Sequence, residues 1–249
     1  MLNYVEYGKE NKYDDDIFFQ KYSQMSRSQQ GLAGAGEWET LRKLLPDFKD
    51  KRVLDLGCGY GWHCIYAMEH GASSVVGVDI SHKMLEVAKE KTHFPQVEYK
   101  CCAIEDVEFP EESFDVILSS LAFHYVADYE ILVKKIYRIL KSGGNLVFTV
   151  EHPVFTAYGT QDWYYNKKGE ILHFPVDNYY YEGKRTAVFL GEKVTKFHRT
   201  LTTYLNTLLS NGFIINHIVE PQPPENMMDI PGMQDEMRRP MMLIVSANK

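Results

Sequence analysis

Three glycines at alternate positions, Gly57, Gly59 and Gly61, follow directly after a strand-like run that contains Asp55. Glycines in such a turn let the backbone bend sharply and let a ligand lie against it without Cβ atoms in between. Asp79 ends the next apolar run, 24 residues after Asp55. A carboxylate at that edge of a sheet can accept hydrogen bonds from both hydroxyls of a ribose. These residues therefore predict a site for a cofactor that contains a nucleoside.

The elements that must position this turn alternate between strand and helix. Short runs rich in Val, Ile and Leu predict strands, and periodic stretches predict helices. The predicted strands are 53–56, 74–79, 97–102, 114–120, 145–151, 213–220 and 241–246, and the predicted helices are 37–45, a helix ending near residue 70, 81–91, 128–140 and 201–209. This alternation favours an α/β fold with a doubly wound, Rossmann-like sheet of mostly parallel strands and helices on both faces.

The spacing of the glycines separates two classes of cofactor. Dinucleotide sites usually carry Gly-x-Gly-x-x-Gly and place a pyrophosphate on the helix N-terminus. This turn reads Gly-x-Gly-x-Gly, with Asp55 two residues before it. A carboxylate there repels a pyrophosphate but attracts an amino group or a sulfonium. The turn thus favours S-adenosylmethionine (SAM), and an NAD-dependent oxidoreductase is the alternative that it leaves open.

Four segments in order along the chain resemble the successive motifs of the class I SAM-dependent methyltransferases, most closely of the branch that acts on small molecules. They are 53–61, 76–81, 104–110 and 113–117. Residues 199–249 are also similar to the family's closing helix and two-strand hairpin. The resemblance implies a seven-stranded sheet whose last strand is antiparallel. It also implies transfer of the methyl group of SAM to a small-molecule acceptor by in-line displacement, with S-adenosylhomocysteine (SAH) as the product.

The resemblance assigns cofactor contacts to positions in and after the glycine turn. Asp55 would face the methionine end of SAM, directly or through water, and Asp79 would bind the ribose hydroxyls. The backbone of Gly57, Cys58 and Gly59 would pass under the cofactor.

A second group of positions would surround the adenine and the amino group of SAM. Ile80 and Ile104 would pack on the two sides of the adenine, and the carbonyl of Ser119 would accept from the amino group. Many relatives carry Asp at the position of Ala103, where it accepts from the adenine amino group. Here Glu105 or a water molecule would replace that contact, or the contact is missing.

Tyr22 and Arg27 precede the alternating region by about one short helix. In similar enzymes such a segment folds over the cofactor, and an Arg pairs with the cofactor's carboxylate, a contact that suits the guanidinium fork. The resemblance therefore implies that Tyr22 and Arg27 bind SAM. A surface helix with an exposed Arg is the alternative.

Three residues at or after the ends of the fourth and fifth predicted strands are candidates for a general base or for contact with the methyl acceptor. They are His124, Glu151 and His152. Because a sulfonium is an activated leaving group, positioning and desolvation can supply much of the rate. A general base is needed only where the acceptor must lose a proton. A structural or cofactor-side role is the alternative for His124. His198 and Arg199, before the last helix, would bind an anionic acceptor or support the fold.

The chain divides into four segments. They are an N-terminal helical lid over 1–36, a SAM-binding core over 37–151, an aromatic-rich substrate cover over 152–198, and a C-terminal helix and β-hairpin over 199–249 that completes the core sheet. We expect the cover to be irregular, and nine of the 33 aromatic residues lie between Glu151 and Tyr181. Residues 162–165 and 179–181 would form an aromatic wall for the acceptor, with a satellite core as the alternative.

Composition excludes several classes of protein. A formal net charge of −7 without a Lys/Arg block argues against binding nucleic acid or an anionic membrane. No window approaches about 18 consecutive apolar residues, no secretory signal is visible, and the four cysteines lack the spacing of a zinc site. We therefore expect a cytoplasmic monomer or homodimer without a metal or a nucleic-acid partner. An RNA or protein methyltransferase and a non-catalytic SAM-binding module are the remaining alternatives.

Overall fold

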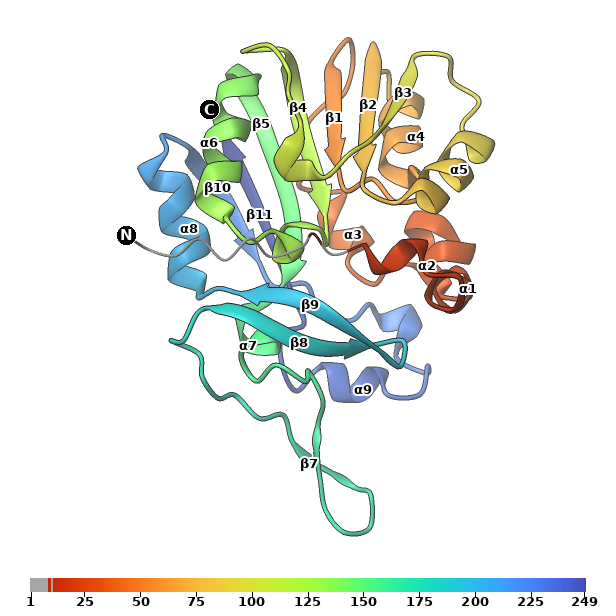
Figure 1. Cartoon of the computed structure of the whole chain (residues 1–249), viewed down its shortest axis with the longest axis vertical. Helices are drawn as coiled ribbons and strands as arrows, with labels where there is room; N and C mark the ends of the chain where they lie inside the picture. The colour runs from red at the N-terminus through yellow and green to blue at the C-terminus, as the bar shows by residue number, and fades with distance from the viewer. Residues whose placement is uncertain (1–8, 10) are drawn as a thin grey trace.

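The computed structural model describes Lys9 and residues 11–249, and its centre is a seven-stranded sheet (Figure 1). The strand order is β10-β11-β5-β4-β1-β2-β3, with β11 antiparallel to both neighbours and the other pairs of this sheet parallel. The predicted doubly wound α/β fold is confirmed. The strands are β1 (Arg52–Leu56), β2 (Ser74–Asp79), β3 (Val97–Cys101), β4 (Phe114–Ser120), β5 (Leu140–Glu151), β10 (Ile214–Val219) and β11 (Met242–Asn248).

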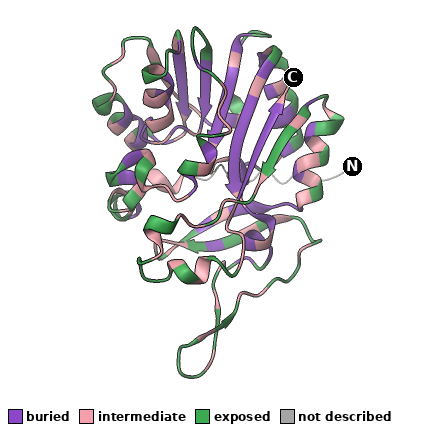
Figure 2. Ribbon diagram, turned by 180° about the vertical axis from the view of Figure 1, so that it is seen from behind, coloured by how far each residue is buried: buried purple, intermediate pink, exposed green. Residues whose placement is uncertain are grey.

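Both faces of the sheet are covered, because successive side chains of a strand point to opposite sides. In β1, Leu54 belongs to the apolar cluster under α6 and α8, and Val53 belongs to the cluster under α3, α4 and α5. Figure 2 shows the resulting buried strands between more exposed helices. These helices are α3 (Trp38–Leu41), α4 (Trp62–Glu69), α5 (His82–Lys91), α6 (Tyr129–Ile139) and α8 (Leu201–Ser210).

Two predicted boundaries are wrong. The helix predicted over 37–45 is shorter, because α3 ends at Leu41 and turns follow it. The fifth strand was expected at residue 145, but β5 begins at Leu140, directly after α6. Phe114 of β4 pairs with Leu140, and the register then shifts before Val116 pairs with Asn145. The glycines at 143–144 therefore lie inside an irregular strand and do not separate helix from strand.

The N-terminal segment lies at the carboxyl ends of the parallel strands (Figure 1). Its elements are η1 (Lys12–Asp14), α1 (Asp16–Ser23), α2 (Ser26–Gln29) and η2 (Gly31–Gly34). Asp14 attaches the segment to the start of α5, where its Oδ1 accepts hydrogen bonds from Ser81 Oγ at 2.6 Å and Lys83 N at 3.2 Å. The N–H groups at a helix N-terminus have no partner within the helix, and an aspartate there accepts hydrogen bonds from them. These hydrogen bonds hold the segment against α5.

Residues 152–198 contain more regular structure than expected. The elements are α7 (Pro153–Ala157), β6 (Tyr164–Tyr165), β7 (Ile171–His173), β8 (Gly183–Phe189) and β9 (Glu192–His198). Leu190 and Gly191, with φ of +53° and +78°, form the tight turn between β8 and β9. The expectation of an irregular segment is therefore wrong for 183–198, where alternating residues on both sides of a Leu-Gly pair are typical of a hairpin.

Short elements complete the connections. They are η3 (Ile104–Asp106) after β3, η4 (Phe123–Tyr125) after β4, and η5 (Glu225–Met227) and α9 (Met233–Glu236) between β10 and β11. The elements η3 and η4 follow the carboxyl ends of their strands, so they join the edge of the sheet where the glycine turn lies.

Candidate active site

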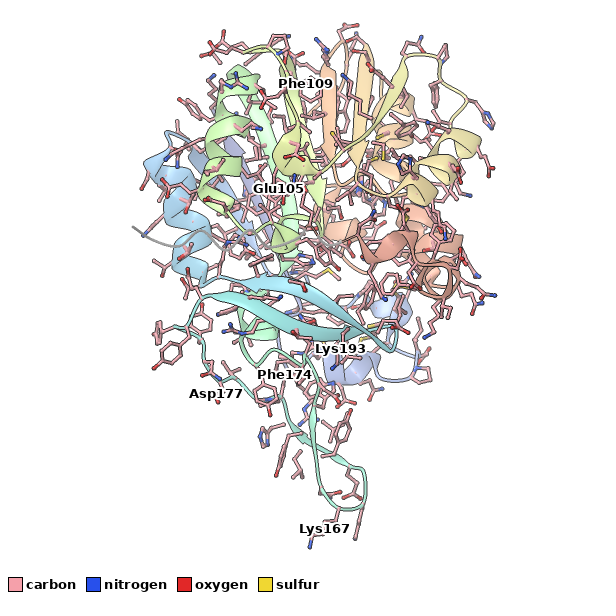
Figure 3. The ribbon with its side chains drawn as sticks, in the orientation of Figure 1. Glu105, Phe109, Lys167, Phe174, Asp177 and Lys193 are labelled. Atoms are coloured by element: carbon pink, nitrogen blue, oxygen red, sulfur yellow. The ribbon has the colours of Figure 1, made fainter. Side chains whose placement is uncertain are left out.

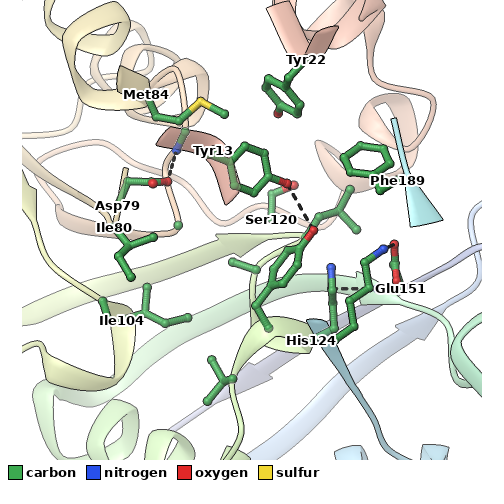
Figure 4. Close-up of a pocket in the computed structure, with 18 of the residues that line it drawn as sticks. Tyr13, Tyr22, Asp79, Ile80, Met84, Ile104, Ser120, His124, Glu151 and Phe189 are labelled. Atoms are coloured by element: carbon green, nitrogen blue, oxygen red, sulfur yellow. Dashed lines mark hydrogen bonds and ion pairs between the residues drawn. The ribbon is translucent and has the colours of Figure 1, made fainter. Parts of the chain in front are cut away.

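A cavity of about 250 Å³ lies at the carboxyl ends of three strands (Figure 4). The last residues of β2, β4 and β5, which are Asp79, Ser120 and Glu151, all line it. Parallel strands end at one edge of the sheet, so motifs far apart in the sequence meet there. The N-terminal segment and the β8–β9 hairpin complete the wall with Tyr13, Tyr22, Met25, Arg27, Phe189 and Lys196.

Most of the predicted site residues are in this wall. The cavity is lined by Tyr22, Arg27, Gly57, Gly59, Asp79, Ile80, Ala103, Ile104, Glu105, His124 and Glu151. The predicted residues Asp55, Cys58, Ser119 and His152 are not in the lining. The structure thus brings together predicted site residues from six separate segments of the sequence.

The glycines of the turn have two different surroundings: two of them are tightly packed, and one borders open space. Gly57 and Gly61 adopt φ of +79° and +75°, and a Cβ at either position would collide with Ala122 or Tyr99. Gly59 has φ of +52°, and apart from its chain neighbours no described residue comes within 4 Å of the place where a Cβ would stand. Gly57 and Gly61 are therefore needed by the fold, whereas Gly59 also leaves room for a ligand.

Backbone amides hold the carboxylate of Asp79. Its Oδ2 accepts from Gly59 N at 2.8 Å, and its Oδ1 accepts from Ser81 N at 2.9 Å. Burial raises the pKa of Asp79, although these hydrogen bonds act in the opposite direction. Each carboxylate oxygen can accept a second hydrogen bond, so Asp79 retains the capacity to bind two hydroxyls.

Ile80, Ala103, Ile104 and Glu105 line the cavity near Asp79. Figure 4 shows Ile80 and Ile104 close together on the Asp79 side of the site. Ala103 presents only a methyl group and backbone there. Glu105 is half-buried, and this burial raises the pKa of its carboxyl.

Asp55 lies behind the cavity wall and has an oxygen without a partner. The residue is 1% exposed, and its Oδ2 accepts from Cys64 Sγ at 3.5 Å. Within the described part of the chain, Oδ1 makes no hydrogen bond. Burial raises the pKa of Asp55 to about 7. A buried oxygen without a donor is costly, so Asp55 is ready to accept from a water molecule or a ligand.

Two further predicted contacts also lie behind the wall. Ser119 is buried, and its Oγ donates to the carbonyl of Leu56 at 2.7 Å, whereas its neighbour Ser120 lines the cavity. Cys58 N donates to Val78 O at 2.9 Å. Cys58 lines a second, smaller cavity.

The smaller cavity, of about 80 Å³, adjoins the first. The two share Tyr22, Arg27, Gly57, Gly59 and Ser120. The structure therefore places Tyr22 and Arg27 between the two spaces. Arg27 is not a free surface residue, because its Nη2 donates to both carboxylate oxygens of Glu37 at 2.9 Å.

A buried ion pair lies at the end of the cavity away from Asp79 (Figure 4). Lys196 Nζ is 2.5 Å from Glu151 Oε1, and the two side chains are 3% and 12% exposed. Gln161 bridges the pair, because its Nε2 donates to Glu151 and its Oε1 accepts from Lys196. Burial acts to raise the pKa of Glu151, but His124 and Lys196 together lower it below its ordinary value. Glu151 is therefore an ionised carboxylate that is held in place.

His124 lies beside this pair and is 2% exposed. Its Nδ1 accepts from the backbone N–H of Glu151 at 3.4 Å. Burial lowers the pKa of His124 to about 4, with Lys196 and Arg199 acting in the same direction and Glu151 against it. The ring is neutral at pH 7, and the hydrogen bond at Nδ1 leaves the proton on Nε2.

His152 does not line the cavity, and the structure gives it a different role. Its Nδ1 accepts from Val154 N at 3.1 Å at the start of α7, and its Nε2 is 2.9 Å from Glu220 Oε1. These contacts join α7 to the end of β10. His152 therefore lies outside the cavity in which the acceptor was expected.

His198 and Arg199 are also occupied by structural contacts. Thr156 Oγ1 lies 2.7 Å from His198 Nδ1, and His198 Nε2 lies 2.9 Å from the carbonyl of Tyr179. Arg199 Nη2 donates to the carbonyl of Ala127 at 3.0 Å and to that of Val126. The structure therefore supports the structural alternative for both residues.

The expected aromatic wall is not in the cavity. None of the aromatic residues between 151 and 181 lines it. Trp163 and Phe174 instead pack around the guanidinium of Arg239. In Figure 3 Phe174 lies below the β8–β9 hairpin, whereas Glu105 lies above it. Trp163 therefore fits the alternative of a satellite core, whereas Tyr164, Tyr165, Tyr180 and Tyr181 of the expected wall are exposed.

Sequence reasoning missed several residues of the cavity. They are Lys9, Tyr13, Met25, Met84, Tyr125, Phe189, Lys196, Met241 and Met242. The alternation of 183–198 was a usable signal for the hairpin that carries Phe189 and Lys196. Among the described residues, no group of His, Cys, Asp and Glu is arranged to hold a metal ion. In the same part of the chain, no helix is long and apolar enough to cross a membrane.

Comparison with known proteins gives extensive matches. A family model described as a methyltransferase domain matches residues 54–148. The crystal structure of an S-adenosylmethionine-dependent methyltransferase from Mesorhizobium loti is 40% identical with a TM-score of 0.81, covering 88% of this chain and 100% of that one. The structure of a candidate S-adenosylmethionine-dependent methyltransferase from Listeria monocytogenes is 57% identical with a TM-score of 0.84, covering 88% of this chain and 99% of that one.

Two curated relatives match different shares of the chain. An uncharacterized protein of Haemophilus influenzae is 34% identical over 250 residues, covering 95% of this chain and 96% of its own length. A ubiquinone biosynthesis O-methyltransferase of Coxiella burnetii is 35% identical over 112 residues, so that this match spans 44% of this chain and 47% of that protein. The matches to these two solved structures, each covering 88% of this chain, lead to one conclusion: the chain belongs to the class I SAM-dependent methyltransferases.

Proposed function

We propose that the chain transfers the methyl group of SAM to a small-molecule acceptor by in-line displacement. The observation that carries the proposal is the roof over the cavity, formed by the N-terminal segment and the β8–β9 hairpin. Phe18 forms one apolar cluster with Ala187 and Val194, and Lys21 Nζ donates to Leu190 O at 3.0 Å. A reaction centre that is covered from two sides accepts a compact molecule more readily than a folded polymer.

The residues of the site fit SAM. Gly59 borders open space, Asp79 has unused acceptor capacity, and Asp55 Oδ1 lacks a donor. When bound, SAM supplies a methyl group on a positively charged sulfur, and SAH is the leaving product. The side chains of this protein would bind the nucleoside at Asp79 and the methionine end at Arg27. The part of the cavity at His124 is then left for the acceptor.

The end of the cavity that would hold the methyl acceptor offers hydrogen-bond donors between aromatic rings. His124 presents Nε2–H, and two of the three N–H bonds of Lys196 are taken by Glu151 and Gln161. The ring of Phe189 lies 5.4 Å from Lys196 Nζ. Because its Nε2 carries the proton, His124 would orient the acceptor and would not remove a proton from it. The enclosed walls would exclude water, so positioning and desolvation carry the chemistry.

A transfer assay with fractionated cell extract tests the proposal. The purified chain is incubated with methyl-tritiated SAM and with small-molecule, RNA and protein fractions separately. Label transferred only in the small-molecule fraction supports the proposal, with Asp79→Ala as the inactive control. Label that enters only RNA or protein would overturn it in favour of a macromolecular acceptor. Absence of SAM and SAH binding at millimolar ligand would contradict any methyl transfer.

A further inference from the structure

The end of the main cavity away from Asp79 holds two titratable groups that are poor bases. Glu151 has a pKa below its ordinary value, and its two oxygens already accept from Lys196 and, at 2.6 Å, from Gln161 Nε2. His124 has a pKa of about 4, and its Nδ1 accepts from the backbone N–H of Glu151. A methyl acceptor that had to lose a proton inside the site would find no good base at this end.

Two hydrogen-bond donors remain available at the same end. Within the described part of the chain, His124 Nε2 has no partner, and it is not among the fully buried polar atoms, so its N–H reaches the cavity. The ammonium of Lys196 has three N–H bonds, of which Glu151 and Gln161 take two. A ligand atom that meets both residues is therefore offered donors from two sides, as an oxygen with several lone pairs requires.

Electrostatics at this end disfavour a cationic methyl acceptor. The ammonium of Lys196 lies 5.4 Å from the ring of Phe189 and 6.0 Å from the ring of Tyr125, so a cation already occupies these aromatic surroundings. Glu151 balances the charge of Lys196. The sulfonium of SAM would add one positive charge, which repels an ammonium and attracts an anion. An anionic methyl acceptor thus fits the charges better than an amine does.

We propose that Lys196 and His124 bind the ionised oxygen of a small organic acid, a carboxylic acid or a phenol, and that this oxygen receives the methyl group. The proposal rests on the proposed function and names the class of its acceptor. Apolar side chains of the same cavity would pack against the body of the acid; they are Leu121, Val126, Phe189, Met241 and Met242.

The reaction then needs no base in the site, because the acid has already lost its proton to water. A lone pair of the oxygen forms the new O–C bond. The C–S bond breaks, and its electron pair stays on sulfur. The products are SAH and a neutral methyl ester or aryl methyl ether. Lys196 and His124 would hold the oxygen with two hydrogen bonds, and a further lone pair is left to attack the methyl carbon.

Calorimetric titration of the SAH-saturated chain with benzoate, benzamide and benzylamine tests the binding step. These probes share one ring and are anionic, neutral and cationic at pH 7. We expect benzoate to bind about tenfold or more tightly than benzamide, as charge-assisted hydrogen bonds require, and benzylamine to bind most weakly. Equal affinities, tighter binding of benzylamine, or no binding of benzoate at millimolar concentration would overturn the inference. Failure to bind SAH would overturn the proposed function as well.

A double variant removes the ammonium without leaving a buried charge unpaired. Lys196→Met with Glu151→Gln should abolish the preference for benzoate over benzamide while SAH still binds. A retained preference would overturn the inference. Lys193→Met is the matched control, because Lys193 belongs to the same strand but is exposed and does not line the cavity. This variant should keep the full preference.

Two variants of His124 test the second donor separately. His124→Gln places an amide N–H near the position of Nε2–H, whereas His124→Phe keeps a flat ring and has no donor. We expect His124→Phe to bind benzoate about tenfold more weakly than the wild type, and His124→Gln to restore much of that affinity. Equal benzoate affinities in the two variants would overturn the role given to His124.

The transfer step is tested on small molecules from cell extract. An anion exchanger at about pH 11 retains carboxylic acids and phenols and passes most amines, which are neutral there. Each fraction is incubated with SAM that carries an isotopic label in its methyl group, and NMR identifies the atom that receives the label. We expect labelled methyl on oxygen, in the retained fraction. Label on nitrogen, sulfur or carbon would overturn the inference and leave the proposed function intact, whereas no label in any small molecule would overturn both.

Discussion

The hydroxyl oxygens of Tyr13 and Tyr125 lie 3.2 Å apart, and both residues line the main cavity. Tyr13 belongs to the N-terminal segment and Tyr125 to η4, which follows β4, so this hydrogen bond joins the roof to the core sheet. The ring of Tyr13 also packs edge-on against Tyr22 at 5.2 Å. We expect the release of a ligand beneath the roof to be slowed by contacts of this kind.

Replacing Tyr13 by Phe should therefore speed the release of SAH. Loss of one neutral hydrogen bond costs about 0.5–1.5 kcal/mol, which corresponds to a dissociation rate about two- to tenfold higher. Stopped-flow fluorescence with SAH measures this rate. Tyr180→Phe is the control, because Tyr180 is 87% exposed. Equal dissociation rates for Tyr13→Phe and the wild type would show that the roof does not retain the ligand.

Asp79→Ala should weaken SAM binding by about a hundredfold, because both ribose hydroxyls would lose their acceptor in a buried site. Calorimetric titration with SAM and SAH measures the affinity. Asp177→Ala, at an exposed position outside the cavity, should bind as the wild type does. Unchanged affinity in Asp79→Ala would refute the ribose contact.

Asp55 makes the stability of the ligand-free protein depend on pH. Burial raises the pKa of Asp55 from 3.8 to about 7 in the folded chain. Between these values the unfolded chain has released the proton while the folded chain keeps it, so stability falls as pH rises through this window and levels off above it. The loss is on the order of 4 kcal/mol for a shift of this size.

Asp55→Asn should remove this dependence. Urea unfolding of the wild type and the variant at intervals from about pH 4 to pH 8.5 gives the two free energies of unfolding. The difference between them should grow in favour of the variant up to about pH 7 and then stay constant. Other groups titrate in both proteins, so they cancel in the difference. A difference that does not vary with pH would contradict the raised pKa.

Lys196→Met should destabilise the fold, because it leaves the buried carboxylate of Glu151 without its cation. Breaking one partner of a buried pair costs about 3–5 kcal/mol. Adding Glu151→Gln should restore most of that stability, whereas transfer to the acceptor should stay impaired in the double variant. Urea unfolding and the tritium assay measure the two effects. Full transfer activity in a stable double variant would exclude this ion pair from the acceptor site.

The residues that could be predicted are those whose position follows from the order of the parallel strands. Gly59 and Ile104 each follow a strand of the predicted sheet, Asp79 ends one, and parallel strands end at one edge. Their convergence needs no knowledge of side-chain packing. The seven-stranded fold could be predicted for the same reason, because alternating elements and right-handed crossovers leave few arrangements.

The residues that could not be predicted depend on contacts between distant segments. Lys196 meets Glu151 across 45 positions of sequence because the β8–β9 hairpin folds back over the strand ends. Glu37 lines the smaller cavity beside Arg27, which α2 brings against it across ten positions of sequence. The place of the aromatic segment could not be predicted, because its composition suits a binding wall as well as a satellite core, and only the packing of Trp163 and Phe174 around Arg239 shows where these two rings lie.

A crystal structure of the chain with SAH tests the account most directly. We expect the ribose at Asp79, the amino-acid end at Arg27, and the sulfur facing the end of the cavity that His124 and Lys196 line. Space beside the sulfur should be enclosed and large enough for a small molecule. A sulfur that faces away from His124, or that opens onto a broad exposed surface suited to a polymer, would contradict the account.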